Sequence, residues 1–118
     1  MKRNHRKLRA WQQAVELVTV IYRLTADFPD TERYGLTSQM RRAAVSVPAN
    51  IAEGAARSGT KELIYFLSVA TGSLSELDTL VELAVKLGYV RDASKIQGQI
   101  DDVAGLIMGL SASLKRRS

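Results

Sequence analysis

The chain has 118 residues, 46% of them hydrophobic, which is enough for one globular domain with its own core. It contains no cysteine and one histidine, His5, so disulfides, thiol catalysis, a Ser-His-Asp triad and a His- or Cys-ligated metal site are set aside. No apolar run approaches the roughly 20 residues of a membrane span, and no signal-peptide core follows the N-terminus. We therefore expect a cytoplasmic protein without a metal, a cofactor or a membrane partner.

The formal net charge of +5 comes from the two ends of the chain. The basic residues near these ends number eight, so the rest of the chain carries a net charge of −3. We predict a single domain over residues 1–118, with basic tails at 1–7 and 115–118. Such tails are either solvated surface or arms that bind a polyanion, and both interpretations stay open. The eight residues are Lys2, Arg3, Arg6, Lys7, Arg9, Lys115, Arg116 and Arg117.

The spacing of apolar residues predicts four helices and no strand. The first carries two adjacent apolar stripes, which is wider than one buried face requires. The fourth carries apolar residues in a strict 4-3-4-3-4 spacing from Ile96 to Leu114, the seam of nearly parallel helices. Short loops between four helices predict an all-α, antiparallel up-down-up-down bundle. The predicted helices cover residues 8–26, 30–55, 60–87 and 92–114.

Capping residues predict where these helices begin and end. Asp30 or Thr31 would cap the second helix, Thr60 the third and Asp92 the fourth, because short polar side chains accept hydrogen bonds from the first free N–H groups. Gly88 would end the third helix. The second helix should continue through Pro48 with a bend, because the apolar periodicity stays in phase across the proline.

In this topology the basic residues converge. The start of the first helix, the end of the fourth and the loop between the second and third share one end of the bundle, and that loop brings Arg57 and Lys61. We predict that these two residues and the eight above form a nucleic-acid-binding pole. A ring of subunits with parallel axes would turn the pole into a basic face.

The second predicted helix contains the most unusual stretch, residues 39–57 (QMRRAAVSVPANIAEGAAR), which includes Pro48 and Gly54 in a helix interior. Polar residues form one stripe along it, and we predict bonds between Arg42 and Ser46 and between Glu53 and Asn50 or Arg57. The stripe is either a network that fixes helix register or a ligand surface. Its members are Gln39, Arg42, Ser46, Asn50, Glu53 and Arg57.

The back of the same helix is small and mostly apolar. It is either an alanine-rich surface that faces water or a face buried against another subunit, and we favour the second interpretation because the first and third helices also carry excess apolar width. The back-face residues are Arg41, Val45, Pro48, Ala49, Ala52 and Ala56.

Residues 54–61 partly resemble a phosphate-binding loop. Two glycines have the correct spacing, but Thr60-Lys61 stands in place of Lys-Ser/Thr and a helix precedes them, so we reject a nucleotide P-loop. The start of the third helix beside Arg57 and Lys61 is a weaker candidate for holding one phosphate of a polyanion.

Residues 28–57 and 66–90 contain the segments FPDTERYGLTSQMRRAAVSVPANIAEGAAR and FLSVATGSLSELDTLVELAVKLGYV. With Trp11, Ala14 and Leu17 they closely resemble the family of proteins encoded in intervening sequences of bacterial 23S ribosomal RNA genes, and residues 41–54 are the specific part. The resemblance covers residues 8–90. It implies a four-helix bundle assembled as a ring, a homopentamer, with no catalytic residues. Family members are similar in architecture to the accessory protein of diversity-generating retroelements, a pentameric barrel associated with nucleic acid and reverse transcriptase, which implies RNA or DNA binding.

Three hypotheses for function follow. The first is a non-enzymatic ring whose basic pole binds nucleic acid, foremost RNA. The alternative is a protein-interaction scaffold that presents the polar stripe to a partner without binding nucleic acid. An enzyme that uses a pair of carboxylates ranks below both, because the acidic residues fall on polar helix faces and no cofactor motif is present.

Overall fold

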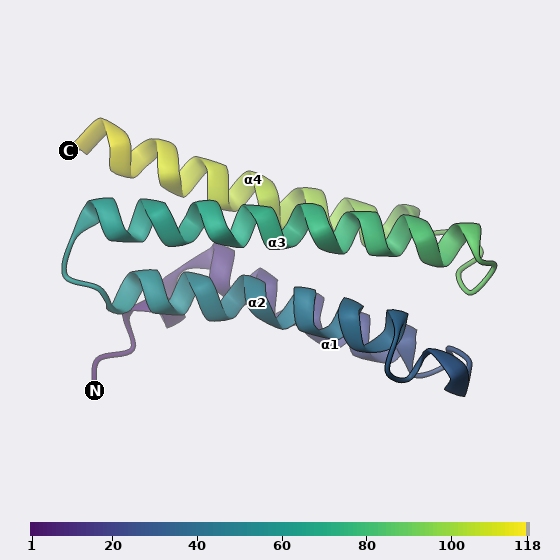
Figure 1. Ribbon diagram of the computed structural model, residues 1–118. Coiled ribbons are helices and arrows are strands. Elements are labelled where there is room, and N and C mark those ends of the chain that lie inside the picture. The colour runs from purple at the N-terminus through teal and green to yellow at the C-terminus, as the bar shows by residue number, and fades with distance from the viewer. Residues whose placement is uncertain (118) are drawn as a thin grey trace.

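The computed structural model describes residues 1–117, and these form four long helices with no strand (Figure 1). The all-α, four-helix prediction is confirmed. A 3₁₀ turn precedes the first helix, and another lies between the first and second. The elements are η1 Asn4–Lys7, α1 Arg9–Thr25, η2 Asp30–Glu32, α2 Leu36–Ala56, α3 Thr60–Lys86 and α4 Ser94–Arg117.

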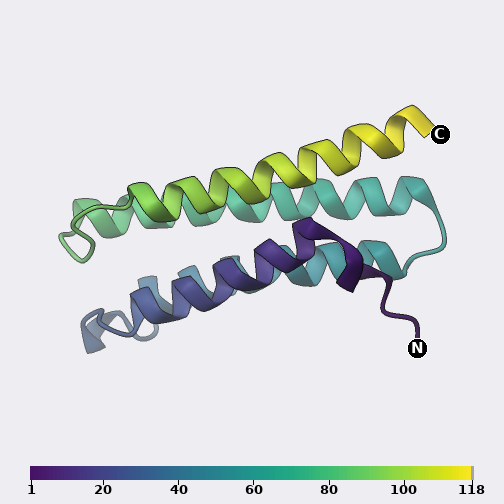
Figure 2. The same ribbon diagram turned by 180° about the vertical axis from the view of Figure 1, so that it is seen from behind.

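Each long helix packs against two others. α1 and α3 both contact α2 and α4, whereas α1 and α3 do not contact each other. The α2–α3 connection lies at the same end of the 46 × 27 × 19 Å molecule as both chain ends, and the other two connections lie at the opposite end (Figures 1 and 2). We call these the basic pole (residues 1–7, 57–61 and 115–117) and the far end (residues 26–35 and 87–93).

The core consists of the predicted apolar positions. Only one of the two stripes of α1 is buried, whereas Trp11, Val15 and Val18 of the other are half-buried and Tyr22 is 43% exposed. The seam of α4 is buried from Ile96 to Ile107. A strip of apolar side chains therefore remains on the α1 side after the core is complete. The most completely buried large side chains are Leu17, Ile21, Met40, Val47, Ile51, Leu67, Leu77, Val81, Val103 and Ile107.

Two predicted caps are wrong. α2 begins at Leu36 instead of near Asp30, because the carboxylate Oε1 of Glu32 accepts a hydrogen bond from the Leu36 backbone N–H at 3.0 Å. Glu32 thus serves a free donor at the helix start, and Asp30 begins the short turn η2. Thr60 is the first residue of α3, and the cap is Gly59, with no side-chain bond.

The other two helix signals are confirmed. Asp92 accepts a hydrogen bond from the backbone N–H of Ser94 at 3.0 Å, where α4 begins. Gly88 has φ +83°, a left-handed conformation that favours glycine, and the Tyr89 N–H returns to the Ala84 carbonyl at 2.9 Å.

α2 is helical without interruption through Pro48, so the predicted continuation is confirmed, whereas the predicted bend stays a prediction. A proline in a helix interior costs about 3 kcal/mol, and the fully buried Val47 and Ile51 beside it hold the segment in place. Pro48 itself is buried inside the chain, so its placement on the outer back face was wrong. Val45 and Ala49 do lie exposed on that face.

Across residues 1–117, no helix combines the length and the apolar character that a membrane span requires.

Candidate nucleic-acid interface

The basic pole brings together three segments that are distant in the sequence: the N-terminal segment, the α2–α3 connection and the end of α4 (Figures 1 and 2). Arg9 is the exception, because it lies farther along α1 in a groove with Asp102 and Gly105 of α4. Every predicted nucleic-acid-binding residue is exposed. Those at the pole are Lys2, Arg3, Arg6, Lys7, Arg57, Lys61, Lys115, Arg116 and Arg117.

The N-terminal segment folds back on α1. The Gln12 side-chain amide donates to the Arg6 carbonyl at 2.7 Å, and the His5 ring meets the Trp11 ring edge-on at 5.0 Å between centroids. The Arg6 guanidinium lies 5.7 Å from the centre of the same ring. Trp11 therefore packs against the N-terminal segment, and Arg3 and Lys7 remain exposed.

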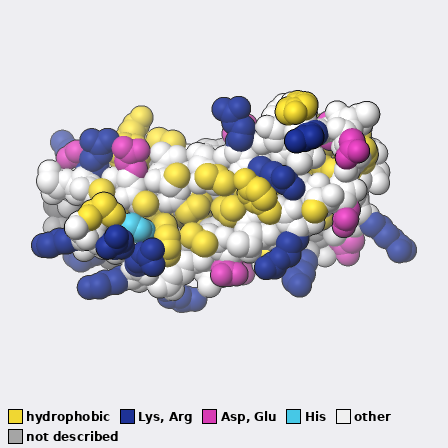
Figure 3. Space-filling view, turned by 90° about the horizontal axis from the view of Figure 1, so that it is seen from below, with side chains coloured by type: hydrophobic (Ala, Val, Ile, Leu, Met, Phe, Trp, Pro, Cys, Tyr) yellow, Lys and Arg dark blue, Asp and Glu magenta, His cyan; other side chains and the backbone are white. Residues whose placement is uncertain are grey.

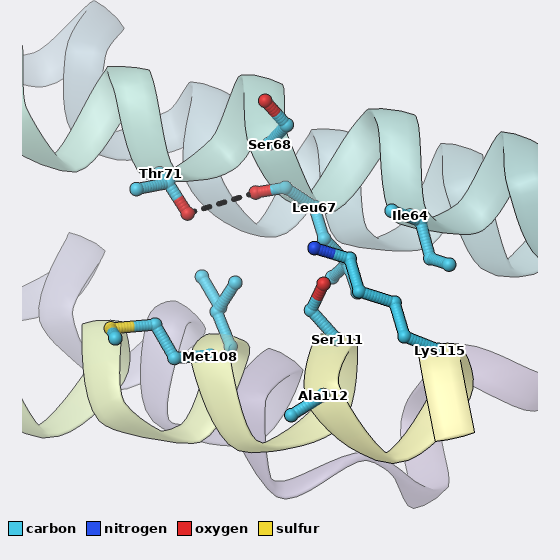
Figure 4. Close-up of a pocket in the computed structure, with 9 residues that line it drawn as sticks. Ile64, Leu67, Ser68, Thr71, Met108, Ser111, Ala112 and Lys115 are labelled. Carbon is cyan, nitrogen blue, oxygen red and sulfur yellow. Dashed lines mark hydrogen bonds between the residues drawn. The ribbon is translucent and has the colours of Figure 1, made fainter.

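The end of α4 carries its basic residues on the last helical turn, where positive charge is favoured by the helix dipole. Lys115 extends from this turn along a groove between α3 and α4 whose floor includes Ile64, Leu67 and Met108 (Figure 4). Arg117 also reaches Ser113, at 3.4 Å. Ser118, the last residue of the predicted C-terminal tail, lies outside the described residues.

The α2–α3 connection supplies Arg57 and Lys61. Arg57 pairs with Glu53 at 2.8 Å, as predicted, and its guanidinium lies 5.3 Å from the centre of the Phe66 ring. The Glu62 carboxylate folds toward Gly59, with Oε1 only 2.7 Å from the point where a Cβ on Gly59 would lie. A carboxylate thus stands beside the start of α3, which disfavours a phosphate at that helix terminus.

The middle of the polar stripe is an interhelical network. Ser46 Oγ and Ser73 Oγ of α3 are 2.8 Å apart, and the Asn50 side-chain amide donates to the Ser46 carbonyl at 2.7 Å and to its Oγ at 3.0 Å. The predicted Arg42–Ser46 bond is therefore wrong, since Ser46 bonds Ser73 and Asn50. Gln39 and Arg42 are exposed. These contacts favour a role for Ser46 and Asn50 in fixing the register of α2 against α3.

Gly54 lies where α2 contacts α3, and Arg41 lies where α2 contacts α1. A Cβ on Gly54 would lie 2.8 Å from the Phe66 Cβ and 3.3 Å from the Leu63 Cα, so glycine permits the close approach of α2 and α3. Arg41 Nε donates to Thr25 Oγ1 at 2.8 Å, and the guanidinium lies 4.5 Å from the centre of the Tyr22 ring. The sequence did not reveal this second contact, because Thr25 is an isolated polar residue at the end of an apolar stripe.

The far end is joined by contacts that the sequence did not reveal. The Tyr89 hydroxyl donates to Glu32 Oε2 at 2.9 Å, and its ring lies 5.4 Å from that of Phe28. Hydrogen bonds from the Leu36 N–H and then from Tyr89 lower the pKa of Glu32, and the bond to Glu32 raises the pKa of Tyr89. Bonds from the backbone and hydroxyl of Ser94 likewise lower the pKa of Asp92.

Among residues 1–117, no three His, Cys, Asp or Glu side chains lie close enough to hold a metal ion.

Comparison with known families matches residues 6–109 to the family described as 23S rRNA-intervening sequence protein. No curated protein matches the chain.

Proposed function

The chain belongs to the 23S rRNA-intervening sequence protein family, and on that premise we propose that it is a non-enzymatic homo-oligomer that binds nucleic acid, foremost RNA, through its basic pole. The observation that carries the proposal is the gathering of exposed basic side chains from three segments, with Glu53 and Glu62 as the acidic residues of the adjoining helix ends. A phosphate backbone attracts such a surface without regard to base sequence.

The arrangement we propose is an up-down-up-down antiparallel bundle, assembled as a ring of five copies with parallel axes. The alternation of the connections between the two ends and the packing of each helix against two others support the antiparallel bundle. The half-buried stripe of α1 supports assembly into a ring. A ring would place several basic poles on one face, so that weak phosphate contacts add by multivalency.

Contacts with the phosphate backbone dominate this mode of binding. The aromatic rings of Trp11 and Phe66 already contact Arg6 and Arg57, which leaves them unsuited to stacking with bases. We therefore expect low sequence preference and strong dependence on salt.

The test is a titration of a labelled, structured ribosomal RNA fragment and of a DNA duplex of equal length, at salt concentrations from 50 to 200 mM. With about six phosphate contacts per complex, affinity should fall on the order of a thousandfold over this range. Tighter binding to the RNA at every salt concentration would assign RNA as the ligand. Binding that does not change with salt, or no binding at low salt, would remove the proposal.

The second candidate function is a protein-interaction scaffold without nucleic-acid binding. The groove in Figure 4 favours it, because Met108 is 65% exposed at the edge of an apolar floor that ends at Lys115. A stoichiometric protein partner that survives nuclease treatment and is lost in Met108→Glu would support this function.

A further inference from the structure

One side of the molecule carries an apolar strip that is only partly buried. It runs along α1 and α2, and Figure 3 shows hydrophobic side chains gathered along the middle of this side, between basic side chains at both ends. Tyr22 is 43% and Val45 42% exposed. We define the apolar strip as Trp11, Val15, Val18, Tyr22, Val45 and Ala49.

Charged residues stand at both ends of the strip on α2. Arg42 is exposed and forms no hydrogen bond, ion pair or ring contact within the described chain. It lies on the half of α2 nearer the far end, whereas Glu53 lies on the half nearer the basic pole. Toward the far end, α2 thus carries Arg42 without an ion pair, whereas toward the basic pole the Glu53 carboxylate is paired with Arg57.

The outer face of α4 carries acidic residues toward the far end and ends in a basic turn. Asp101 and Asp102 are exposed near its beginning and form no ion pair in residues 1–117, and its last turn is basic. Between these charges the side chains are small. A Cβ on Gly98, Gly105 or Gly109 would meet nothing within 4 Å, although each glycine costs the helix about 1 kcal/mol relative to alanine. Packing inside the chain therefore does not explain these glycines. The α4 outer face consists of Gly98, Asp101, Asp102, Gly105, Gly109 and Ala112.

Arg42 on α2 and the acidic residues of α4 lie at the same height along the bundle. Arg42 lines a groove with Glu76 of α3, and the neighbouring Ser75 lines a groove with Asp101 of α4. Near the basic pole, Gly54 lies against Leu63, next to Ile64, which shares a groove with Lys115. Arg42 is thus level with Asp101. Glu53 is level with Lys115, whose side chain lies in the groove between α3 and α4.

We infer that the apolar strip of one copy packs against the α4 outer face of the next copy. In a ring with parallel axes, residues at equal heights meet, so Arg42 would face Asp101 and Asp102. The glycines would let Val45 and Tyr22 approach the α4 backbone. The contact joins two different faces, which is the kind of interface that closes a ring. The inference rests on the proposed ring and specifies which surfaces form it.

Disulfide trapping tests the contact directly, because the chain has no cysteine. Val45→Cys is combined in turn with Gly98→Cys, Gly105→Cys and Gly109→Cys to cover the register, since a disulfide requires Cα atoms about 4.4–6.8 Å apart. We expect one pair to form covalent multimers on oxidation, whereas each single variant stays monomeric on a non-reducing gel. The control pairs Val45→Cys with Gly72→Cys, an exposed position on α3.

Charge reversal supplies an independent readout. Arg42→Glu alone and Asp102→Arg alone should each raise the concentration at which the assembly dissociates by about tenfold, and the double variant should recover most of that loss. Arg91→Glu in the far-end loop is the control of equal charge. Light scattering of the unmodified protein distinguishes failure of the proposed ring from failure of the proposed contact. A monomer overturns the proposed ring, whereas a ring without trapping or reversal effects overturns only the choice of faces.

Discussion

The two ends of the bundle use their polar residues differently. At the far end, Glu32 accepts hydrogen bonds from Leu36 and Tyr89, so each carboxylate oxygen serves a partner in the fold. At the basic pole, Lys61 and Arg116 are exposed and form no described contact within the chain. Under the proposed function, the far end contributes stability, whereas the basic pole keeps charge available for nucleic acid.

Removing charge at each end gives the largest expected contrast. Lys61→Gln, Arg116→Gln and Arg117→Gln together should weaken RNA binding by about 10- to 100-fold and reduce the salt slope by up to about 3. Unfolding free energy should stay within about 0.5 kcal/mol of the unmodified value.

The matched control is an equal loss of charge at the far end and in the adjoining first turn of α4: Arg33→Gln, Arg91→Gln and Lys95→Gln. Its affinity for RNA, measured by anisotropy, should change less than twofold. Equal losses of affinity in the two triple variants would mean that net charge, and not the pole, attracts the nucleic acid.

Packing near the basic pole can be tested apart from its charges. Gly54→Ala should lower the free energy of unfolding by about 1–3 kcal/mol, because the new methyl group would overlap the Phe66 side chain. Gly72→Ala should instead raise it by about 0.5–1 kcal/mol, because Gly72 is a helical position with open space around it. Urea denaturation compares the two, and stabilisation by both substitutions would contradict the close approach of α2 and α3.

A substitution at the far end should lower the stability of the fold without changing the affinity for RNA. Tyr89→Phe removes the hydroxyl that donates to Glu32 and keeps the ring against Phe28, so we expect a small decrease in the urea midpoint. Tyr34→Phe is the control, because Tyr34 is 86% exposed. RNA affinity should be unchanged in both. A Tyr89→Phe variant as stable as the unmodified protein would show that the far end does not depend on this contact.

Features that depend on residues close together in the sequence were predicted correctly. The apolar spacing predicted the buried face of α4, which consists of Ile96, Ile100, Val103 and Ile107. The four-residue separation of Glu53 and Arg57 predicted their ion pair. The pole could be anticipated because helix number and loop length fix which segments share an end.

Contacts between distant residues were not predictable in this way. Tyr89 and Glu32 are 57 positions apart, and their bond depends on how the two far-end connections meet. Pro48 was misplaced because the rotation of α2 is set by its packing against α1 and α3, which periodicity defines only to within a neighbouring position. The Ser46–Ser73 contact likewise required the relative height of two helices.

Acid should weaken the far end first, and the effect is the smallest of those expected here. The pKa values of Glu32 and Asp92 are lowered by hydrogen bonds to their ionised forms in the folded chain. Their contributions to stability are therefore complete above the pKa of the unfolded chain, about pH 4, and are lost as pH falls through the lower folded pKa. Stability should thus decline below about pH 4 and be nearly constant from there to neutral pH for these groups.

Glu32→Gln isolates the share of this decline that belongs to one carboxylate. Glutamine keeps one of the two oxygens, so it can accept from Leu36 or from Tyr89 but not from both, and it has no proton to gain in acid. The variant should therefore be less stable than the unmodified protein at pH 7 and should lose less stability between pH 5 and pH 3. Urea midpoints at these values measure both effects. Parallel curves for the two proteins would mean that the Leu36 and Tyr89 bonds do not favour the ionised carboxylate. The stabilising role of the far end would then rest on the Phe28–Tyr89 packing and the Gly88 turn alone.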